Sequence, residues 1–215
     1  MSFRDRRDAG ERLASVLDDC DVDADVVVAV PRGGVPVGRI VADELGVPLG
    51  VVVAKKLGAP GNSELAIGAV AADGTIWRNE NLVRRLGVDP GYVERERKRV
   101  ARAAKEKATR YAPDGPLDLA GKRVLVVDDG VATGATMFAC IESCRNAGAK
   151  SVAVGIPVAP PHTVEELKRV ADDVCAVETP PHFAAVGQFY ERFEQVSDEE
   201  AIAALKPPRR GAPGA

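Results

Sequence analysis

Residues 122–136 read KRVLVVDDGVATGAT, and this stretch decides the fold. The aliphatic run Val124 to Val127 is typical of a strand buried on both faces of a parallel sheet. Two adjacent acids follow, then a short loop with two glycines, then a helical pattern that continues to about Ala147. Strand, loop and helix in this order place the loop at the carboxyl edge of the sheet, where such folds bind ligands.

The loop after the acids has the features of a phosphate site. Glycine lets the main chain approach a ligand closely, and threonine adds a hydroxyl donor without charge. A helix that begins within the loop offers unpaired N–H groups and a partial positive charge. An ordinary acid-capped strand–turn–helix is the alternative. The predicted phosphate-binding residues are Gly130, Val131, Ala132, Thr133, Gly134, Ala135 and Thr136.

Asp128 and Asp129 stand beside this loop, where they would repel a phosphate. Successive strand residues point to opposite sides, so at most one acid faces a given group. Carboxylates suit the place if they meet ribose hydroxyls, Mg²⁺ or a cation-like C1′ at a breaking glycosidic bond. Two unit charges about 4 Å apart interact by roughly 4 kcal/mol at an effective dielectric of about 20. One carboxylate could therefore contribute several powers of ten in rate.

Strand and helix patterns alternate on both sides of this stretch, which predicts right-handed βαβ units. The expected fold class is α/β, a twisted parallel sheet flanked by helices. A hairpin is expected at 68–77, and the charged helix at 90–111 is expected to be a solvated surface helix. Further strands are predicted at 25–30, 48–54, 151–158 and 173–178, and helices at 5–19, 35–46, 81–86, 90–111 and 162–171.

Composition narrows the class of protein. The chain has 215 residues, a net charge of -3 and a pI near 5.6, which argues against nucleic-acid or anionic-membrane binding. It shows no signal peptide and no apolar run of membrane-spanning length, so a cytoplasmic location is expected. A single domain over residues 1–205 and a disordered tail over 206–215 are predicted.

The four cysteines are Cys20, Cys140, Cys144 and Cys175. None forms a CxxC pair, and the chain has only two histidines, so a zinc site is not expected. Buried free thiols in a reducing compartment are the prediction.

The string VLVVDDGVATGAT resembles the 5-phosphoribosyl 1-diphosphate (PRPP) signature of type I phosphoribosyltransferases, in which two acids and a short linker precede T-G-x-T. A Walker A loop does not fit, because no GKT or GKS follows. Residues 26–48, VVVAVPRGGVPVGRIVADELGVP, are similar to the family's pyrophosphate loop in the RGG form of xanthine-guanine enzymes. The resemblance implies that Arg32, Gly33 and Gly34 hold the pyrophosphate; a plain tight turn before a helix is the alternative.

Residues 55–68 occupy the place of the family's flexible catalytic loop, which closes over the reacting centre. The resemblance implies that Lys55 acts in catalysis and that Lys56 contacts the pyrophosphate, with a solvated lysine pair as the alternative. Glu64 is expected to be a surface acid, with a metal or substrate contact as the alternative. KKLGAPGNSELAIGAV is similar to a poorly characterised subgroup of bacterial and archaeal members.

Residues 177–193, VETPPHFAAVGQFYERF, correspond to the hood that holds the acceptor base in purine-using relatives, here expected at about 178–196. Phe183 or Tyr190 could stack on a base and Gln188 could hydrogen-bond it, whereas Phe189 and Phe193 are expected to pack on the core. Ala132 replaces an aspartate of many purine enzymes and matches the alanine of uracil enzymes, which leaves the acceptor open.

The resemblance thus implies a Mg²⁺-dependent transferase that moves phosphoribose from PRPP to a nitrogenous base and releases pyrophosphate. Asp128 and Asp129 would act in catalysis and bind the metal. The implied partners are small molecules, with no nucleic acid and no membrane, and a homodimer is expected by analogy. A nucleotide-sensing regulator without transfer activity and a phosphoribosyl hydrolase are the alternatives.

Overall fold

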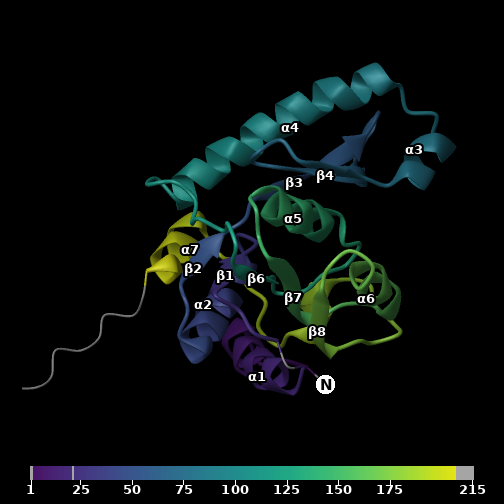
Figure 1. The fold of residues 1–215 in the computed structure, drawn as a ribbon. Coiled ribbons are helices and arrows are strands. Elements are labelled where there is room, and N and C mark those ends of the chain that lie inside the picture. The colour runs from purple at the N-terminus through teal and green to yellow at the C-terminus, as the bar shows by residue number, and fades with distance from the viewer. Residues whose placement is uncertain (1, 21, 207–215) are drawn as a thin grey trace, which may run out of the picture.

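A five-stranded parallel sheet forms the centre of the protein, with helices on both faces (Figure 1). The computed structural model describes residues 2–20 and 22–206. The arrangement confirms the predicted α/β class with a parallel sheet flanked by helices. In spatial order the strands are β2 (Leu49–Val51), β1 (Val26–Ala29), β6 (Arg123–Val127), β7 (Ser151–Val158) and β8 (Asp173–Glu178).

Alternate residues of the central strands pack into two hydrophobic cores, one on each face of the sheet. Val124 and Val126 pack with Met137 of α5 (Ala135–Asn146), on the face that also carries α6 (Pro161–Leu167). Leu125 and Val127 pack with Leu13 of α1 (Arg6–Asp19), on the face that carries α2 (Gly34–Leu45). Because both faces are covered, the central strands β1 and β6 are almost entirely aliphatic rather than alternately polar.

The strand order reverses between β1 and β6. From β1 the chain passes through α2 to β2 on one side, whereas from β6 it passes through α5 to β7 on the other. In open parallel sheets a crevice forms at such a reversal, outside the carboxyl ends of the two strands. The loop at Arg32 follows β1 and the loop at Asp128 follows β6, so both predicted phosphate loops lie at this crevice.

The protein also has a second, antiparallel sheet, of which only the hairpin at 68–77 was predicted. This sheet consists of β3 (Ala54–Ala59), β4 (Asn62–Ala71) and β5 (Ile76–Arg78), followed by α3 (Glu80–Arg85) and α4 (Pro90–Tyr111). Figure 1 shows the long helix α4 lying along β3 and β4. This unit has its own core, formed by Leu57, Ile67, Val70, Val88, Val93 and Val100. The hairpin predicted at 68–77 is confirmed as the pairing of β4 with β5.

The loop predicted over residues 55–68 is wrong, because most of that segment pairs as β3 and β4. The first four residues of β4, Asn62 to Leu65, are exposed and mostly polar, so the sequence lacks the apolar alternation by which a strand is recognised. The strand predicted at 48–54 is also interrupted, since β2 ends at Val51 and the chain enters the second sheet at Ala54. The helix predicted at 162–171 ends at Leu167.

Cys20 and Cys175 form a disulfide between the end of α1 and β8, so the prediction of four free thiols is wrong for this pair. They are 155 positions apart in sequence, and only the packing of α1 against β8 brings them together. Cys140 and Cys144 are free and buried as predicted, and burial raises the pKa of the Cys144 thiol to about 12.

Two further predictions concern the chain ends and the membrane. The tail predicted over 206–215 falls, beyond Lys206, outside the described residues. Within residues 2–20 and 22–206, none of the helices combines the length and apolar character needed to cross a bilayer.

Candidate active site

The loops after β1 and β6 touch each other at the crevice. A Cβ built on Gly33 would lie 1.9 Å from Oδ2 of Asp129, and one on Gly34 would lie 2.8 Å from Cα of Asp128. Only glycine leaves room for so close an approach. The second and third residues of the RGG motif therefore pack directly against the two acids, which joins the two sequence motifs into one site.

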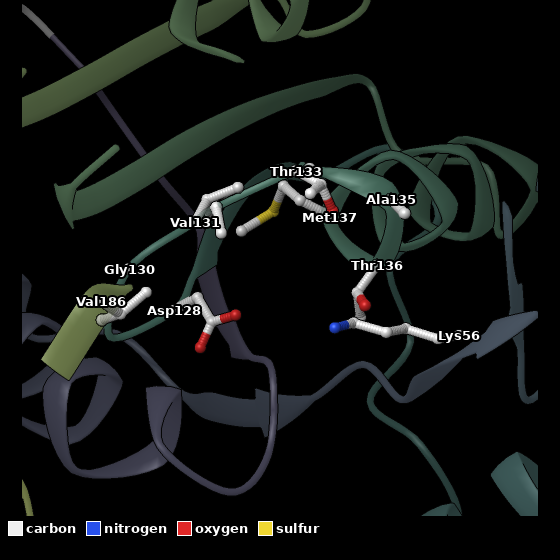
Figure 2. A pocket seen from close by; sticks show the side chains of 11 residues that line it. Lys56, Asp128, Gly130, Val131, Thr133, Ala135, Thr136, Met137 and Val186 are labelled. Carbon is white, nitrogen blue, oxygen red and sulfur yellow. The ribbon is translucent and has the colours of Figure 1, made fainter. Parts of the chain in front are cut away.

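A pocket of about 220 Å³ opens beside this contact (Figure 2). Figure 2 shows the carboxylate of Asp128 and the ammonium group of Lys56 pointing into it from opposite sides. All seven predicted phosphate-loop residues line the pocket, together with Met137 and Val186, which the sequence did not single out. The pocket thus combines a cation, a carboxylate and a helix terminus.

The start of α5 is open toward the pocket. Gly134 is its N-cap residue, in the left-handed region with φ of 76°, and no side chain caps the helix there. Two hydrogen bonds fix the loop that precedes α5. The Val131 amide donates to the Val158 carbonyl at 2.9 Å, and Thr163 Oγ1 donates to the Ala132 carbonyl at 2.7 Å. The first-turn amides of α5 have no intrahelical acceptor, so they are available to an anion.

Substituting Gly134 with alanine is expected to weaken this anion site. The left-handed conformation costs a non-glycine residue roughly 1–2 kcal/mol, and the new Cβ would meet the Phe138 ring at 2.7 Å. Gly87→Ala is the matched control, because Gly87 also has a positive φ of 58° but nothing within 4 Å of its Cβ position. Both variants should lose stability in chemical denaturation, whereas only Gly134→Ala should lose affinity for ribose 5-phosphate in calorimetry. Equal affinities in the two variants would contradict this assignment.

The two acids have different surroundings. Asp129 is buried, and its Oδ2 accepts a hydrogen bond from Nε of Arg6 at 2.8 Å. The Arg6 guanidinium also donates to the Glu194 carbonyl at 2.8 Å and lies 4.1 Å from the centroid of the Phe193 ring. Asp128 instead lines the pocket, and its Oδ1 accepts the Asp129 amide at 2.8 Å. One acid is therefore neutralised by an arginine, and the other is directed at the ligand space.

Burial raises the pKa of the Asp128 carboxyl well above its usual range, and the neighbouring charge of Asp129 raises it further. Burial also raises the pKa of Asp129, although the ion pair with Arg6 opposes this shift. Holding Asp128 ionised thus costs free energy. A cation or a developing positive charge beside it would recover that cost, which is the electrostatic arrangement expected where positive charge develops in a transition state.

Several predicted residues lie away from the pocket lining. Lys55 is exposed, and Arg32 NH1 lies 4.0 Å from Asp198 Oδ1. Phe183 does not line the pocket but packs on Phe189, with ring centroids 5.1 Å apart. The hood reaches the pocket through the aliphatic side chain of Val186 instead.

The polar groups of the hood are largely engaged within it. Gln188 Oε1 accepts from the amides of Ala184 and Ala185 at 3.0 and 3.2 Å, and its Nε2 donates to the His182 carbonyl at 3.2 Å. Tyr190 donates from its hydroxyl to the Asp129 carbonyl at 2.6 Å. These side chains shape the loop, and they are not directed at an acceptor.

A family model described as "Phosphoribosyl transferase domain" matches residues 6–193. The chain belongs to the phosphoribosyl transferase family. This confirms the resemblance carried by the two loops. The matched residues include the loops after β1 and β6, the second sheet, and the hood up to Phe193.

Individual relatives agree with this assignment. A protein of Mycobacterium tuberculosis (strain ATCC 25618 / H37Rv), named "Putative phosphoribosyl transferase Rv0571c", is 39% identical over 204 residues. That match covers 94% of this chain and 46% of the relative, so the chain spans under half the length of this relative. The crystal structure of TT1426 from Thermus thermophilus is 44% identical with a TM-score of 0.81, over 95% of this chain and 98% of that one. A stretch of 68 residues is 35% identical to uracil phosphoribosyltransferase of Staphylococcus haemolyticus, over 32% of each protein.

Sequence reasoning missed two cations of this phosphoribosyl transferase domain. Arg6 lies in the charged N-terminal segment and reaches Asp129 across 123 positions of sequence. Lys107 lies on α4, interpreted as a solvated surface helix, yet it donates to the Pro31 carbonyl at 2.9 Å. Neither residue belongs to a local motif, and each is identified only by the packing of its helix.

The donor set fits a Mg²⁺ ion that arrives with the substrate of such a transferase. Across the described residues, no three acidic, histidine or cysteine side chains converge to hold a metal. Asp128 offers a hard carboxylate oxygen in the pocket, and Mg²⁺ usually takes one or two carboxylates with water and substrate phosphates as its other ligands. Asp129 as a direct ligand stays a prediction, since its Oδ2 is paired with Arg6.

A larger pocket of about 520 Å³ lies elsewhere in the domain. Its lining is mostly apolar and comes from β2, α4, the loop that follows α4 and the end of α5, with Asp73, Lys105 and Thr109 among its polar members. None of the predicted site residues lines it. The smaller pocket, which holds the acid and the helix terminus, is therefore the candidate active site.

Proposed function

We propose that this protein transfers 5-phosphoribose from PRPP to a nitrogenous base and releases pyrophosphate in a Mg²⁺-dependent reaction. The observation that carries the proposal is the pocket at the strand-order reversal, where the open terminus of α5 and the carboxylate of Asp128 face one space. An anion site and an anionic side chain in one small pocket suit a ligand with a phosphate at one end and positive charge developing at the other.

In this proposal the 5′-phosphate accepts hydrogen bonds from the first-turn amides of α5 and from the hydroxyls of Thr133 and Thr136. Asp128 accepts from a ribose hydroxyl and stabilises the positive charge that develops at C1′. The bond from C1′ to the pyrophosphate oxygen breaks, its electron pair leaves with pyrophosphate, and an acceptor nitrogen forms the new bond and loses a proton to water. Mg²⁺, when bound, neutralises charge on the departing diphosphate. Positioning and electrostatics supply the rate, because no enzyme nucleophile is needed.

The part of the pocket next to the hood favours a small acceptor, or an aromatic base that is bound by packing against the faces of its ring. Val186 packs closely over Gly130, since its Cγ1 lies 2.6 Å from the position of a Cβ built there. The amide group of Gln188 is occupied within the hood. The uracil enzyme found among the relatives supports a pyrimidine as the first base to try, and Ala132 is compatible with it. Water is the second candidate acceptor, because the hood residue that lines the pocket, Val186, has no polar side-chain group to recognise a base.

The deciding assay follows pyrophosphate release from PRPP and Mg²⁺ with a panel of nucleobases. Release that depends on one base, together with formation of its nucleoside monophosphate, is the expected result. Release of equal rate without any base would identify a hydrolase, and PRPP binding without turnover would identify a sensor. Size-exclusion chromatography of the same preparation tests the expected homodimer.

A further inference from the structure

Lys107 is a partly buried cation beside the pyrophosphate loop. It lies in the last turns of α4, and its Nζ donates to the Pro31 carbonyl, one residue before Arg32. An ammonium group has three N–H donors, and this bond uses one. In the described part of the chain, no carboxylate lies within ion-pair distance of its Nζ. The ammonium group also lies 5.7 Å from the centroid of the Tyr111 ring. Two N–H donors are therefore left for a ligand.

The charges around Lys107 favour an anion. Burial lowers the pKa of Lys107, and the nearby cations Arg32 and Lys55 lower it further, while Asp198 and Asp128 act in the opposite direction. Asp198 is already engaged, because it accepts from Arg110 at 2.6 Å and from the Tyr111 hydroxyl at 2.5 Å. Gathering cations at a partly buried site costs free energy unless an anion joins them.

We propose that Lys107 is a ligand of the diphosphate group, and that α4 completes the pyrophosphate site together with the Arg32–Gly34 loop. The inference rests on the proposed function and assigns a residue of that same site. Lys107 holds the Pro31 carbonyl, which fixes the loop, and directs its remaining donors at the diphosphate oxygens. The second sheet and α4 thereby become part of substrate binding, because the helix that packs on β3 and β4 delivers the cation.

The test uses two substitutions at Lys107 and a control on the same helix. Lys107→Gln removes the charge but retains a donor for the Pro31 carbonyl, and Lys107→Arg retains the charge. Lys98→Met is the control, since the Lys98 side chain is 72% exposed and forms a surface ion pair with Glu94 at 3.5 Å. Calorimetry with Mg²⁺ measures the affinity of each variant for PRPP, for inorganic pyrophosphate and for ribose 5-phosphate.

Lys107→Gln should weaken binding of PRPP and pyrophosphate about tenfold, the usual effect of losing one charge-assisted hydrogen bond. Ribose 5-phosphate, which lacks the diphosphate, should bind all variants equally, and Lys107→Arg should remain close to wild type. Unchanged PRPP affinity in Lys107→Gln overturns the inference, and so does a parallel loss for ribose 5-phosphate. If the wild-type protein binds ribose 5-phosphate and pyrophosphate but transfers to no base, the proposed function fails while the Lys107 result still stands.

Discussion

Replacing Asp128 with asparagine is expected to lower kcat by about a thousandfold while increasing the stability of the fold at neutral pH. A carboxylate about 4 Å from a developing cation contributes roughly 4 kcal/mol at the dielectric of a protein surface, which sets the scale of the loss in rate. Stability changes in the opposite direction, because desolvation and the neighbouring Asp129 make the partly buried Asp128 carboxylate costly to ionise, and its neutral amide replacement carries no such cost.

The stability gain should depend on pH with a defined sign. Since the folded-state pKa of Asp128 is raised, its protonated form favours folding, and that contribution is lost as pH rises through the folded pKa. Asp128→Asn should therefore melt above wild type at neutral pH, and the two curves should converge as the pH falls and wild-type Asp128 becomes protonated. Thermal melts from pH 4 to pH 8, about the range where carboxyls with raised pKa titrate, measure this.

Asp25→Asn provides the control with the opposite sign. Hydrogen bonds from Arg123 lower the pKa of Asp25 to about 2, so its ionised form favours folding and asparagine should not stabilise the protein at neutral pH. Activity should be unchanged in this variant, because Asp25 lies at the start of β1, at the far end of the strand from the pocket. A kcat for Asp128→Asn near that of wild type would remove Asp128 from the mechanism, and a lower melting temperature at neutral pH would refute the electrostatic account.

The central sheet could be predicted from sequence because its signals are local. The run Val124 to Val127 is aliphatic because both faces of β6 are covered, and the glycines of the two predicted phosphate loops mark places where only backbone fits. The pairing of β3 with β4 gave no such signal, since Lys55 and Lys56 of β3 and the first residues of β4 are exposed and the two strands pair through their backbones. A local interpretation of a polar, Gly- and Pro-rich segment cannot distinguish a solvated hairpin from a loop.

The candidate site was also predictable only where its signals are local in sequence. Asp128 and the loop from Gly130 to Thr136 were identified by an uninterrupted motif, and the structure places them around one pocket. Arg6 and Lys107 were not identified, because each reaches the site from a helix distant in sequence. Arg6 pairs with Asp129 and not with Asp128, and this pairing makes the surroundings of the two acids different. Because the two residues are identical and adjacent in sequence, the sequence alone did not indicate which of them faces the pocket.

Substituting Arg6 with methionine is expected to destabilise the protein by about 3 kcal/mol, the usual effect of leaving a buried charge without its partner. Both side chains of the Arg6–Asp129 pair are 13% exposed, so solvent cannot replace the lost guanidinium. Without Arg6 the pKa of Asp129 should rise further, and the loss of stability should grow as the pH rises through that pKa. Urea denaturation at several pH values measures the effect.

Combining Arg6→Met with Asp129→Asn separates the charge effect from lost packing. If the unpaired carboxylate causes the instability, the double variant should recover more than half of the loss, and the remainder reflects the contacts of Arg6 with Phe193 and the Glu194 carbonyl. Arg7→Met is the surface control, because the Arg7 side chain is 77% exposed in its pair with Glu11 and should be dispensable. A double variant no more stable than Arg6→Met alone would show that Arg6 acts by packing. In that case neutralisation of Asp129 could not explain why Asp128 alone faces the pocket.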